Sequence, residues 1–166
     1  MKNDLANFTP ALEEWFEKFG RHDLPWRQNI NPYRVWVSEI MLQQTQVSRV
    51  ADKFFPNFLA KFPTIFDLAK SDWKELYPVW DGLGYYARGK NMLKTAQILV
   101  EQNDGNFPEK LELLEALPGI GKYTASAILA FAFDKKIPAI DTNLKKIFKA
   151  VAPQKNSVEV GEFLIS

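Results

Sequence analysis

One glutamate in this sequence has surroundings that could change its chemistry. On a helix, the neighbours of Glu39 one turn away are Val35, Trp36, Leu42 and Gln43, and three of these four are apolar. Burial on such a face disfavours the charged carboxylate, so it raises the pKa and suits the group to act as a general acid near neutral pH. Taken alone, the residue is better explained as a surface glutamate or as half of a buried structural ion pair.

Asp141 is the second carboxyl group of interest. It follows Pro138-Ala139-Ile140 and precedes Thr142-Asn143, so it is an ordinary N-cap for the helix predicted to follow. A carboxylate at a helix N-terminus stays ionised, because the helix dipole and the free backbone N–H groups favour the charge. The capping role is therefore compatible with a role as a persistent anion in a site.

The stretch from Leu117 to Ala125 reads Leu-Pro-Gly-Ile-Gly-Lys-Tyr-Thr-Ala and joins two predicted helices. Glycines allow positive φ and remove side chains, so backbone N–H groups at the start of the second helix can approach an anion closely. A Gly-x-Gly sequence alone is more simply a turn between helices. With Lys122 after it and Asp141 about twenty residues later, we interpret the stretch as a phosphate clamp beside a catalytic carboxylate.

These motifs, in this order, resemble those of a known family. The hairpin sequence with Asp141 is similar to the helix-hairpin-helix signature of the DNA glycosylase superfamily that includes endonuclease III. Other stretches resemble the adenine DNA glycosylases (the MutY family): Leu24-Pro25-Trp26-Arg27, Ser38-Glu-Ile-Met-Leu-Gln-Gln-Thr-Gln-Val47 and Gly82-Leu-Gly-Tyr-Tyr-Ala-Arg88. The similarity covers roughly residues 24–149.

The resemblance assigns roles to the two carboxyl groups. It implies that Glu39 protonates adenine at N7 and that Asp141 stabilises an oxocarbenium-like sugar cation. Glycoside hydrolysis commonly divides the work in this way. Asn143 matches a family position that helps to orient the site, whereas Thr142 stands where the family usually has glycine.

Tyr123 bears on the mechanism. Bifunctional members of the superfamily have a lysine here, which forms a Schiff base with the sugar and leads to strand cleavage. A phenol cannot form one, and the adjacent Lys122 projects about 100° away on a helix. The resemblance therefore implies a monofunctional glycosylase. The alternative is that Tyr123 is a packing aromatic at a helix start.

A base inside a duplex must be extruded before chemistry can occur on it. The resemblance implies that Gln44 and Tyr85 enter the base stack. It places four residues against the DNA backbone: Leu117, Gly119, Gly121 and Lys122. It places three around the flipped adenine: Trp26, Arg27 and Leu42. Any one of the aromatics would, by itself, more often be a core residue. We assign no role to His22, the single histidine.

Composition limits the class of protein. The chain is 46% hydrophobic and 14% aromatic, which indicates a folded protein. It has neither a long apolar run nor a signal-peptide pattern, so we expect no membrane contact and a cytoplasmic location. The absence of cysteine excludes disulfides and a cysteine-ligated iron–sulfur cluster, and we expect no metal or cofactor. Charge is uneven: net +3 from Lys122 onward (seven Lys, four acidic residues) and −2 before it, which favours phosphate binding at the hairpin.

No sustained period-two alternation is present, so we predict an all-α fold. In the first half of the chain we predict a helix at Ala11–Phe19 after the capping pair Thr9-Pro10, one from Asn31-Pro32 to about Val50 and a further one that Pro56 ends or kinks. Two short helices capped by Thr64 and Ser71 follow. In the second half we predict helices at Tyr86–Gln102, 109–117 and Tyr123–Phe133, one after Asp141 and one from about Ser157. The resemblance implies the helix-hairpin-helix glycosylase fold, with a six-helix domain at 21–136. Residues 1–20 and 137–166 would form a second lobe that carries the catalytic Asp.

Most family members continue into a four-cysteine iron–sulfur segment and a C-terminal domain that inspects the opposite base. Neither is in this sequence, so we expect a short form with an incomplete second lobe. Three functions remain open. The chain is a monofunctional base excision repair glycosylase for adenine opposite 8-oxoguanine or guanine, a mismatch glycosylase for T or U opposite G, or a DNA-binding remnant without catalysis. Glu39 and Asp141 together favour an enzyme, and Gln43-Gln44 favours adenine. We expect a monomer whose partner is double-stranded DNA with mismatched adenine.

Overall fold

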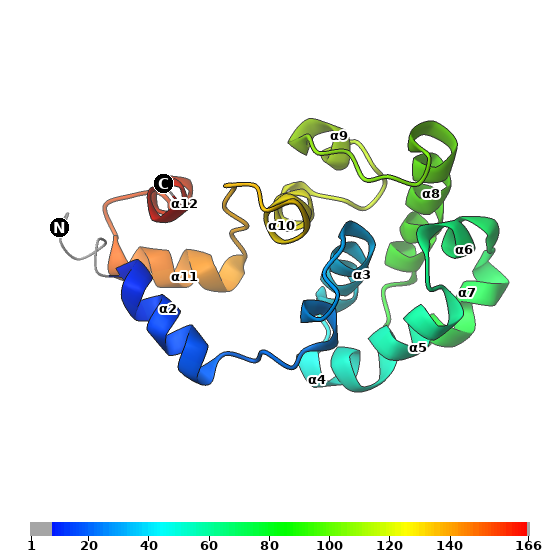
Figure 1. The fold of residues 1–166 in the computed structure, drawn as a ribbon, viewed down its shortest axis with the longest axis horizontal. Helices are drawn as coiled ribbons and strands as arrows, with labels where there is room; N and C mark the ends of the chain where they lie inside the picture. The colour runs from blue at the N-terminus through cyan, green and yellow to red at the C-terminus, as the bar shows by residue number, and fades with distance from the viewer. Residues whose placement is uncertain (1–7, 166) are drawn as a thin grey trace.

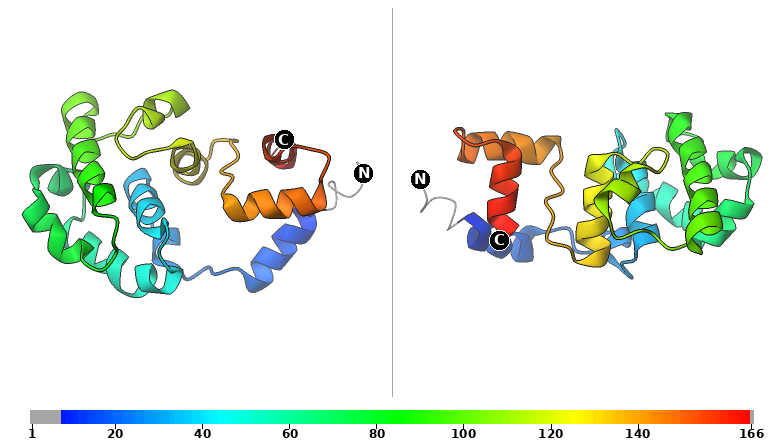
Figure 2. Two further views of the ribbon diagram at one scale, coloured as in Figure 1. Left: turned by 180° about the vertical axis from the view of Figure 1, so that it is seen from behind. Right: turned by 90° about the horizontal axis from the view of Figure 1, so that it is seen from above.

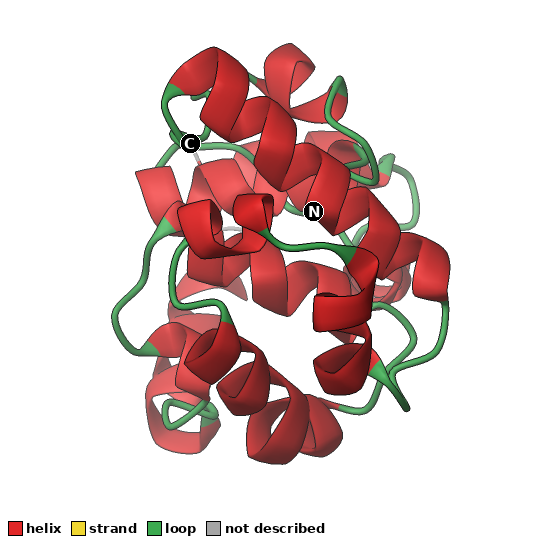
Figure 3. Cartoon of the chain, turned by 90° about the vertical axis from the view of Figure 1, so that its right-hand side faces the viewer, coloured by secondary structure: helices red, strands yellow, loops and turns green. Residues whose placement is uncertain are grey.

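All regular secondary structure is helical among residues 8–165, the part of the chain that the computed structural model describes (Figure 3). The first elements are α2 (Phe8–Phe19), the 3₁₀ turn η1 (Pro25–Arg27), α3 (Pro32–Leu42), α4 (Val47–Arg49), the π-helical η2 (Val50–Phe54), α5 (Phe55–Lys61), α6 (Ile65–Lys70) and α7 (Trp73–Trp80). Then follow α8 (Tyr86–Asn103), α9 (Leu111–Glu115), α10 (Lys122–Phe133), α11 (Thr142–Val151) and α12 (Ser157–Ile165). The all-α prediction is confirmed.

The helices form two groups, seen from three directions in Figures 1 and 2. Helices α2, α11 and α12 lie together at one end, and the other helices form the larger group. The segments 20–31 and 134–141 connect the two groups. This grouping parallels the two predicted lobes, while the boundaries at 21 and 136 stay a prediction.

The larger group has the main hydrophobic core. Helix α3 packs against α10, and α6 packs against α8. Trp36, Met41, Phe58 and Trp80 are at most 1% exposed in this core. Burial of such large apolar side chains contributes about 1.5–3 kcal/mol each to folding, so α3 has a rigid base on which to present its polar residues. The smaller group has a separate minor cluster around Phe148 and Val160.

Local side-chain hydrogen bonds determine where the helices start. The Asn31 side chain accepts a hydrogen bond from the backbone of Arg34 at the start of α3, and Thr64 caps α6 in a reciprocal capping box. The predicted N-cap at Ser71 is wrong by one residue. Asp72 caps α7 instead: its side chain accepts a hydrogen bond from the backbone N–H of Glu75, and the Glu75 side chain accepts one from the backbone N–H of Asp72. Ser71 is the C-cap of α6. At the N-terminus, α2 already begins at Phe8, so the expected capping pair Thr9-Pro10 lies inside its first turn.

The helix predicted from Asn31-Pro32 to about Val50 is in fact broken. Helix α3 ends at Leu42, and Gln44 has a left-handed backbone with φ of +57°, which no α-helix continues through. A second helical run then continues from Val47 to Lys61. Pro56 lies in it without ending it, and the π-helical η2 precedes this residue, which has no N–H to donate. The break leaves residues 43–46 as a loop in which Gln44 and Gln46 are exposed.

No helix within the described range of residues combines the length and the apolar character needed to cross a membrane.

Candidate active site and DNA-facing surface

A cavity of about 560 Å³ lies between the two groups of helices. Its walls come from α2, from the connection after it, from α3 and from the C-terminal half of α10, through Phe16, His22, Trp26, Arg27, Ile30, Val35, Ser38, Glu39, Ala130 and Phe131. A cavity of this size, mostly apolar with a few polar groups, is typical of a site for a small molecule.

Glu39 gives the cavity its acidic group. Burial raises the pKa of the Glu39 carboxyl above its ordinary value, a hydrogen bond with the Tyr123 hydroxyl lowers it in part, and the negative charge of Asp141 raises it further. Desolvation is the largest of these causes, as expected from the apolar neighbours of Glu39 on its helix. The raised pKa predicted from the sequence is thus present, and the residue's role as an acid stays a prediction.

Asp141 caps α11, as predicted. Its Oδ1 accepts a hydrogen bond of 2.7 Å from the backbone N–H of Leu144. Its Oδ2 accepts one of 3.2 Å from the side-chain amide of Asn143. Both carboxylate oxygens are therefore held by donors, which fixes the orientation of the group.

Tyr123 connects the two helices that carry the acid and the hairpin. It is the second residue of α10, and its hydroxyl lies near Glu39 across the α3–α10 interface, where each group influences the pKa of the other. Burial, and then the nearby charges of Glu39 and Asp141, strongly raise the pKa of the phenol. The hydroxyl therefore stays protonated at neutral pH. The role of Tyr123 in the mechanism, and the alternative of a packing aromatic, stay predictions.

Two of the three residues predicted to surround the flipped adenine lie at this cavity, and their role stays a prediction. Trp26 and Arg27 line the cavity with Glu39. The Trp26 ring meets Phe55 edge-on, with centroids 5.6 Å apart, so its position is fixed by the main core. Leu42 is not among the residues that line the cavity; it packs, partly buried, against the main core. Its side chain lies in the last turn of α3, just before the break that the sequence did not predict.

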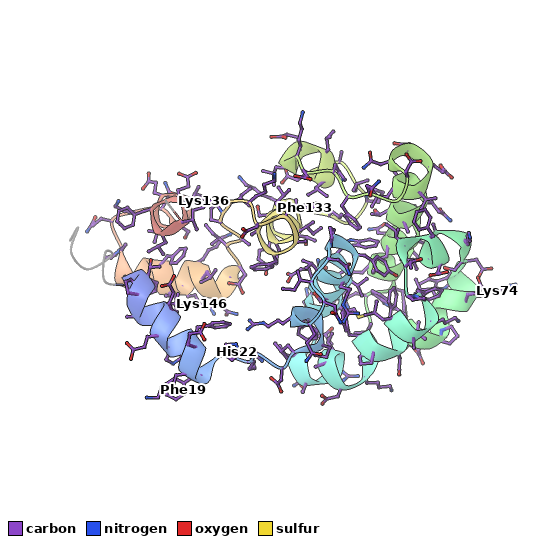
Figure 4. The ribbon with its side chains drawn as sticks, in the orientation of Figure 1. Phe19, His22, Lys74, Phe133, Lys136 and Lys146 are labelled. Carbon is purple, nitrogen blue, oxygen red and sulfur yellow. The ribbon has the colours of Figure 1, made fainter. Side chains whose placement is uncertain are left out.

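Several residues of the cavity were not predicted, among them Phe16, His22 and Phe131. His22 lies on the connection that leaves α2 (Figure 4), with its Nε2 3.0 Å from the carbonyl oxygen of Phe16. The two rings meet edge-on at 4.8 Å, and the Arg27 guanidinium lies over the Phe16 ring at 4.9 Å. None of these residues has a local signal of function. Phe131 is 54% exposed, and only the structure reveals this exposure of a large apolar side chain.

The connection between α9 and α10 is longer than predicted, because α9 covers only Leu111–Glu115 instead of 109–117. The two glycines have different functions. Gly119 uses positive φ (+78°), and a Cβ there would lie 2.9 Å from Asn91 Cβ. Gly121 has an ordinary φ of −94° and does not use the positive φ that glycine allows. A Cβ on Gly121 would meet nothing within 4 Å, so this glycine leaves open space before α10.

The side chains around the glycines point in different directions. Leu117 is 8% exposed and belongs to the main core, so it can offer a ligand only its backbone. Lys122 is exposed at the first helical position of α10. An exposed lysine beside free backbone N–H groups at a helix N-terminus is suited to an anion such as a phosphate.

The two residues predicted to enter the base stack share an unusual backbone. Gln44 and Tyr85 are both exposed and both have positive φ, +57° and +47°. Tyr85 is 62% exposed, although it is a large aromatic. Left-handed backbone at a non-glycine residue costs free energy and often marks a functional position.

The sequence offers no thiolate to an iron–sulfur cluster, because it contains no cysteine. Among residues 8–165 no group of three or more His, Asp or Glu side chains is arranged to hold a metal ion.

Comparison with known proteins defines the family. A model of the HhH-GPD superfamily of base excision DNA repair proteins matches residues 37–161. The chain belongs to this superfamily. It is 44% identical over 140 residues to the adenine DNA glycosylase of Buchnera aphidicola subsp. Baizongia pistaciae, which covers 84% of this chain and 40% of that protein. It is 36% identical over 173 residues to the human adenine DNA glycosylase, covering 97% and 31%.

The HhH-GPD chain described here thus spans less than half the length of these curated relatives. Its fold matches solved structures. A thermostable thymine-DNA glycosylase superposes with a TM-score of 0.89 at 23% identity, over 99% of this chain and 80% of that one. Endonuclease III trapped in a covalent intermediate with DNA gives 0.76 at 22% identity, over 96% and 76%. These likenesses confirm the predicted helix-hairpin-helix glycosylase fold.

Proposed function

We propose that this chain is a monofunctional DNA glycosylase of base excision repair, which extrudes adenine mispaired with 8-oxoguanine or guanine and releases it by hydrolysis. One observation carries the proposal: the Glu39 carboxyl lines a cavity beside Trp26, and its pKa is raised by burial and by the nearby charge of Asp141, although the Tyr123 hydroxyl lowers it in part. The similarity to adenine DNA glycosylases supports adenine as the base.

The first step is proton donation. A carboxyl group with a raised pKa holds its proton closer to neutral pH, so Glu39 can protonate the leaving base as the bond between base and sugar lengthens. The proton moves from Glu39 to the base, and a carboxylate remains. The Tyr123 hydroxyl then stabilises this carboxylate through the hydrogen bond that it donates.

The second step is stabilisation of the sugar. As the base departs, positive charge develops on the sugar ring, and the ionised Asp141 carboxylate provides the opposite charge. The hydrogen bonds from Leu144 and Asn143 hold that carboxylate in one orientation. Water then adds to the sugar carbon and releases one proton to the solvent, which leaves an abasic site in an intact strand.

Strand cleavage would require an amine nucleophile at the site. The position that faces Glu39 holds the Tyr123 phenol, which keeps its proton at neutral pH because its pKa is raised. Lys122, one residue earlier on α10, is exposed and projects about 100° away around the helix. These features support hydrolysis without lyase activity.

The partner proposed for this site is double-stranded DNA, engaged by one copy of the chain. The hairpin at 117–121 and Lys122 would hold backbone phosphates, which position a protein on DNA without reading the sequence. Gln44 and Tyr85 would fill the space that the extruded base leaves. All these groups belong to one chain, so a monomer suffices.

The proposal is tested by single-turnover base release from duplexes with A, T or U opposite guanine or 8-oxoguanine, with an A·T duplex as control. Release of adenine from the mismatches is expected. Release of T or U alone would instead assign a pyrimidine mismatch glycosylase. Duplex binding without release of any base would identify a DNA-binding remnant.

A further inference from the structure

Arg88, near the start of α8, reaches two loops that lie far apart in the sequence. Its Nη1 donates hydrogen bonds to the carbonyl oxygens of Ile40 at 2.6 Å and Gln43 at 2.5 Å. Its Nη2 donates to the carbonyl oxygens of Leu83 at 3.1 Å and Gly84 at 3.5 Å. One guanidinium group thus joins the end of α3 and the loop after it to the loop before α8.

The contacted carbonyls lie next to the two exposed residues with positive φ. Gln43 immediately precedes Gln44, and Gly84 immediately precedes Tyr85. The Arg88 guanidinium also lies 5.4 Å from the centre of the Tyr85 ring. Arg88 therefore fixes the backbone from which each exposed side chain projects, and it does so for both at once.

The chemistry of arginine suits this task. Its planar guanidinium has separate Nη1 and Nη2 donors, so it can satisfy carbonyls on two sides at fixed separation, whereas lysine offers one compact ammonium group. Arg88 is half-buried, and this burial lowers the pKa of its guanidinium because it partly removes the charge from water. The carbonyls of the two loops offset that desolvation.

The same face of α8 also contacts the hairpin. Asn91 lies one turn after Arg88, against Gly119, and Thr95 one turn further donates a hydrogen bond of 2.8 Å to the Pro118 carbonyl. A cavity of about 200 Å³, lined by residues that include Gln43, Arg88 and Asn91, lies between α3, α8 and the hairpin. One helix face thus positions all three loops expected to face DNA.

We propose that Arg88 is a positioning residue that fixes the loops 43–46 and 82–85 relative to each other, so that Gln44 and Tyr85 enter the base stack as one unit during base extrusion. This inference rests on the proposed function. It concerns a step before the chemistry, which can be measured without base release.

Arg49 is a matched control. Its Nη2 donates one hydrogen bond, of 3.1 Å, to the carbonyl oxygen of Gly82 in the same loop. Its guanidinium lies over the Phe54 ring at 5.5 Å, and within the described part of the chain the bridge to the loop 43–46 comes from Arg88 rather than from Arg49. Arg49→Gln thus removes one arginine charge and one bond to the loop 82–85 while leaving the bridge between the loops intact.

The experiment follows fluorescence of 2-aminopurine placed at the target position of a duplex, which increases when the base leaves the stack. Arg88→Gln and Arg88→Lys should each reduce the extrusion equilibrium by about tenfold or more, the usual effect of losing charge-assisted hydrogen bonds. Arg49→Gln should change it little. Affinity for a fully paired duplex should fall equally in Arg88→Gln and Arg49→Gln, since each loses one positive charge.

Full extrusion by Arg88→Lys would overturn the inference, as would equal effects of Arg88→Gln and Arg49→Gln. A wild-type chain that gives no extrusion signal would also overturn it. Extrusion without any base release would overturn the proposed function instead and leave the role of Arg88 standing.

A further measurement needs no Arg88 variant and therefore avoids any folding defect. Gln44→Ala, Tyr85→Ala and the double variant change exposed side chains only. If the two residues act as a unit, the effect of the double variant on the extrusion equilibrium should differ by about threefold or more from the product of the effects of the two single variants. Multiplicative effects would show that the loops act independently and would overturn the inference.

Discussion

Glu39→Gln should nearly abolish base release and should also stabilise the folded chain at neutral pH. Glutamine has almost the same shape as glutamate and can still accept the hydrogen bond from Tyr123, but it cannot donate a proton to a leaving base. General acid catalysis typically contributes about 100-fold to 10,000-fold, so the single-turnover rate should fall by that amount. Binding to the duplex should change little.

The expected gain in stability follows from the raised pKa of Glu39. Burial raises this pKa above 4.5 in the folded chain, so the folded state binds the proton more tightly than the unfolded state does. The wild-type free energy of unfolding therefore falls progressively as the pH rises from about 4.5 through the folded-state pKa. The loss amounts to about 1.4 kcal/mol for every tenfold difference in proton affinity between the folded and unfolded states. Glutamine does not titrate and escapes this loss.

Urea unfolding of both proteins across pH 4 to 8 measures the difference directly. The two free energies of unfolding should be close at the acidic end, and the variant should become the more stable protein as the pH rises. Wild-type base release should decline over the same range in which Glu39 loses its proton. Glu101→Gln, at an exposed position of α8, is the matched control and should change neither property.

Two outcomes would refute this reasoning. A loss of base release much smaller than 100-fold would mean that Glu39 is not the acid. A stability difference between variant and wild type that does not depend on pH would mean that burial does not raise the pKa of Glu39.

Three further predictions concern the hairpin, Asp141 and Tyr123. Gly121→Val should weaken binding to any duplex with little loss of stability, because no atom lies within 4 Å of the added Cβ, whereas Gly119→Ala should lower the free energy of unfolding by about 1 kcal/mol or more, because φ is positive and Asn91 is close. Titration of a labelled duplex measures the binding and urea unfolding measures the stability. Equal losses of stability in the two variants would contradict the prediction. Asp141→Asn should keep the helix cap, since asparagine caps as well as aspartate, but lose most base release; a marked fall in Tm would show that the charge is structural. The wild-type product should be an intact strand that breaks only in alkali, and borohydride should trap little covalent adduct between the protein and DNA. Tyr123→Lys should increase the amount of trapped adduct. Efficient trapping by the wild type would identify another lysine as the nucleophile.

Features that depend on a few consecutive residues could be predicted from the sequence. The cap at Asp141, the cap at Thr64 and the glycine turn before α10 each involve hydrogen bonds or φ angles within about four residues. The apolar neighbours of Glu39 likewise follow from helical periodicity, which is why the direction of its pKa change could be predicted. The break after Leu42 was missed because no glycine or proline marks it; Gln44 takes the left-handed conformation instead.

Contacts between distant segments were decided by the tertiary structure. The sequence showed that the position of Tyr123 offers no amine for a Schiff base, but only the packing of α3 against α10 brings its hydroxyl near Glu39. In the same way, His22 joins the cavity because the connection after α2 passes α3. Arg88 reaches the carbonyl oxygens of Ile40 and Gln43, which lie more than forty residues earlier in the chain. Such contacts form where they best satisfy buried polar groups and fill the core together, and that balance depends on all the packed helices at once rather than on any local pattern.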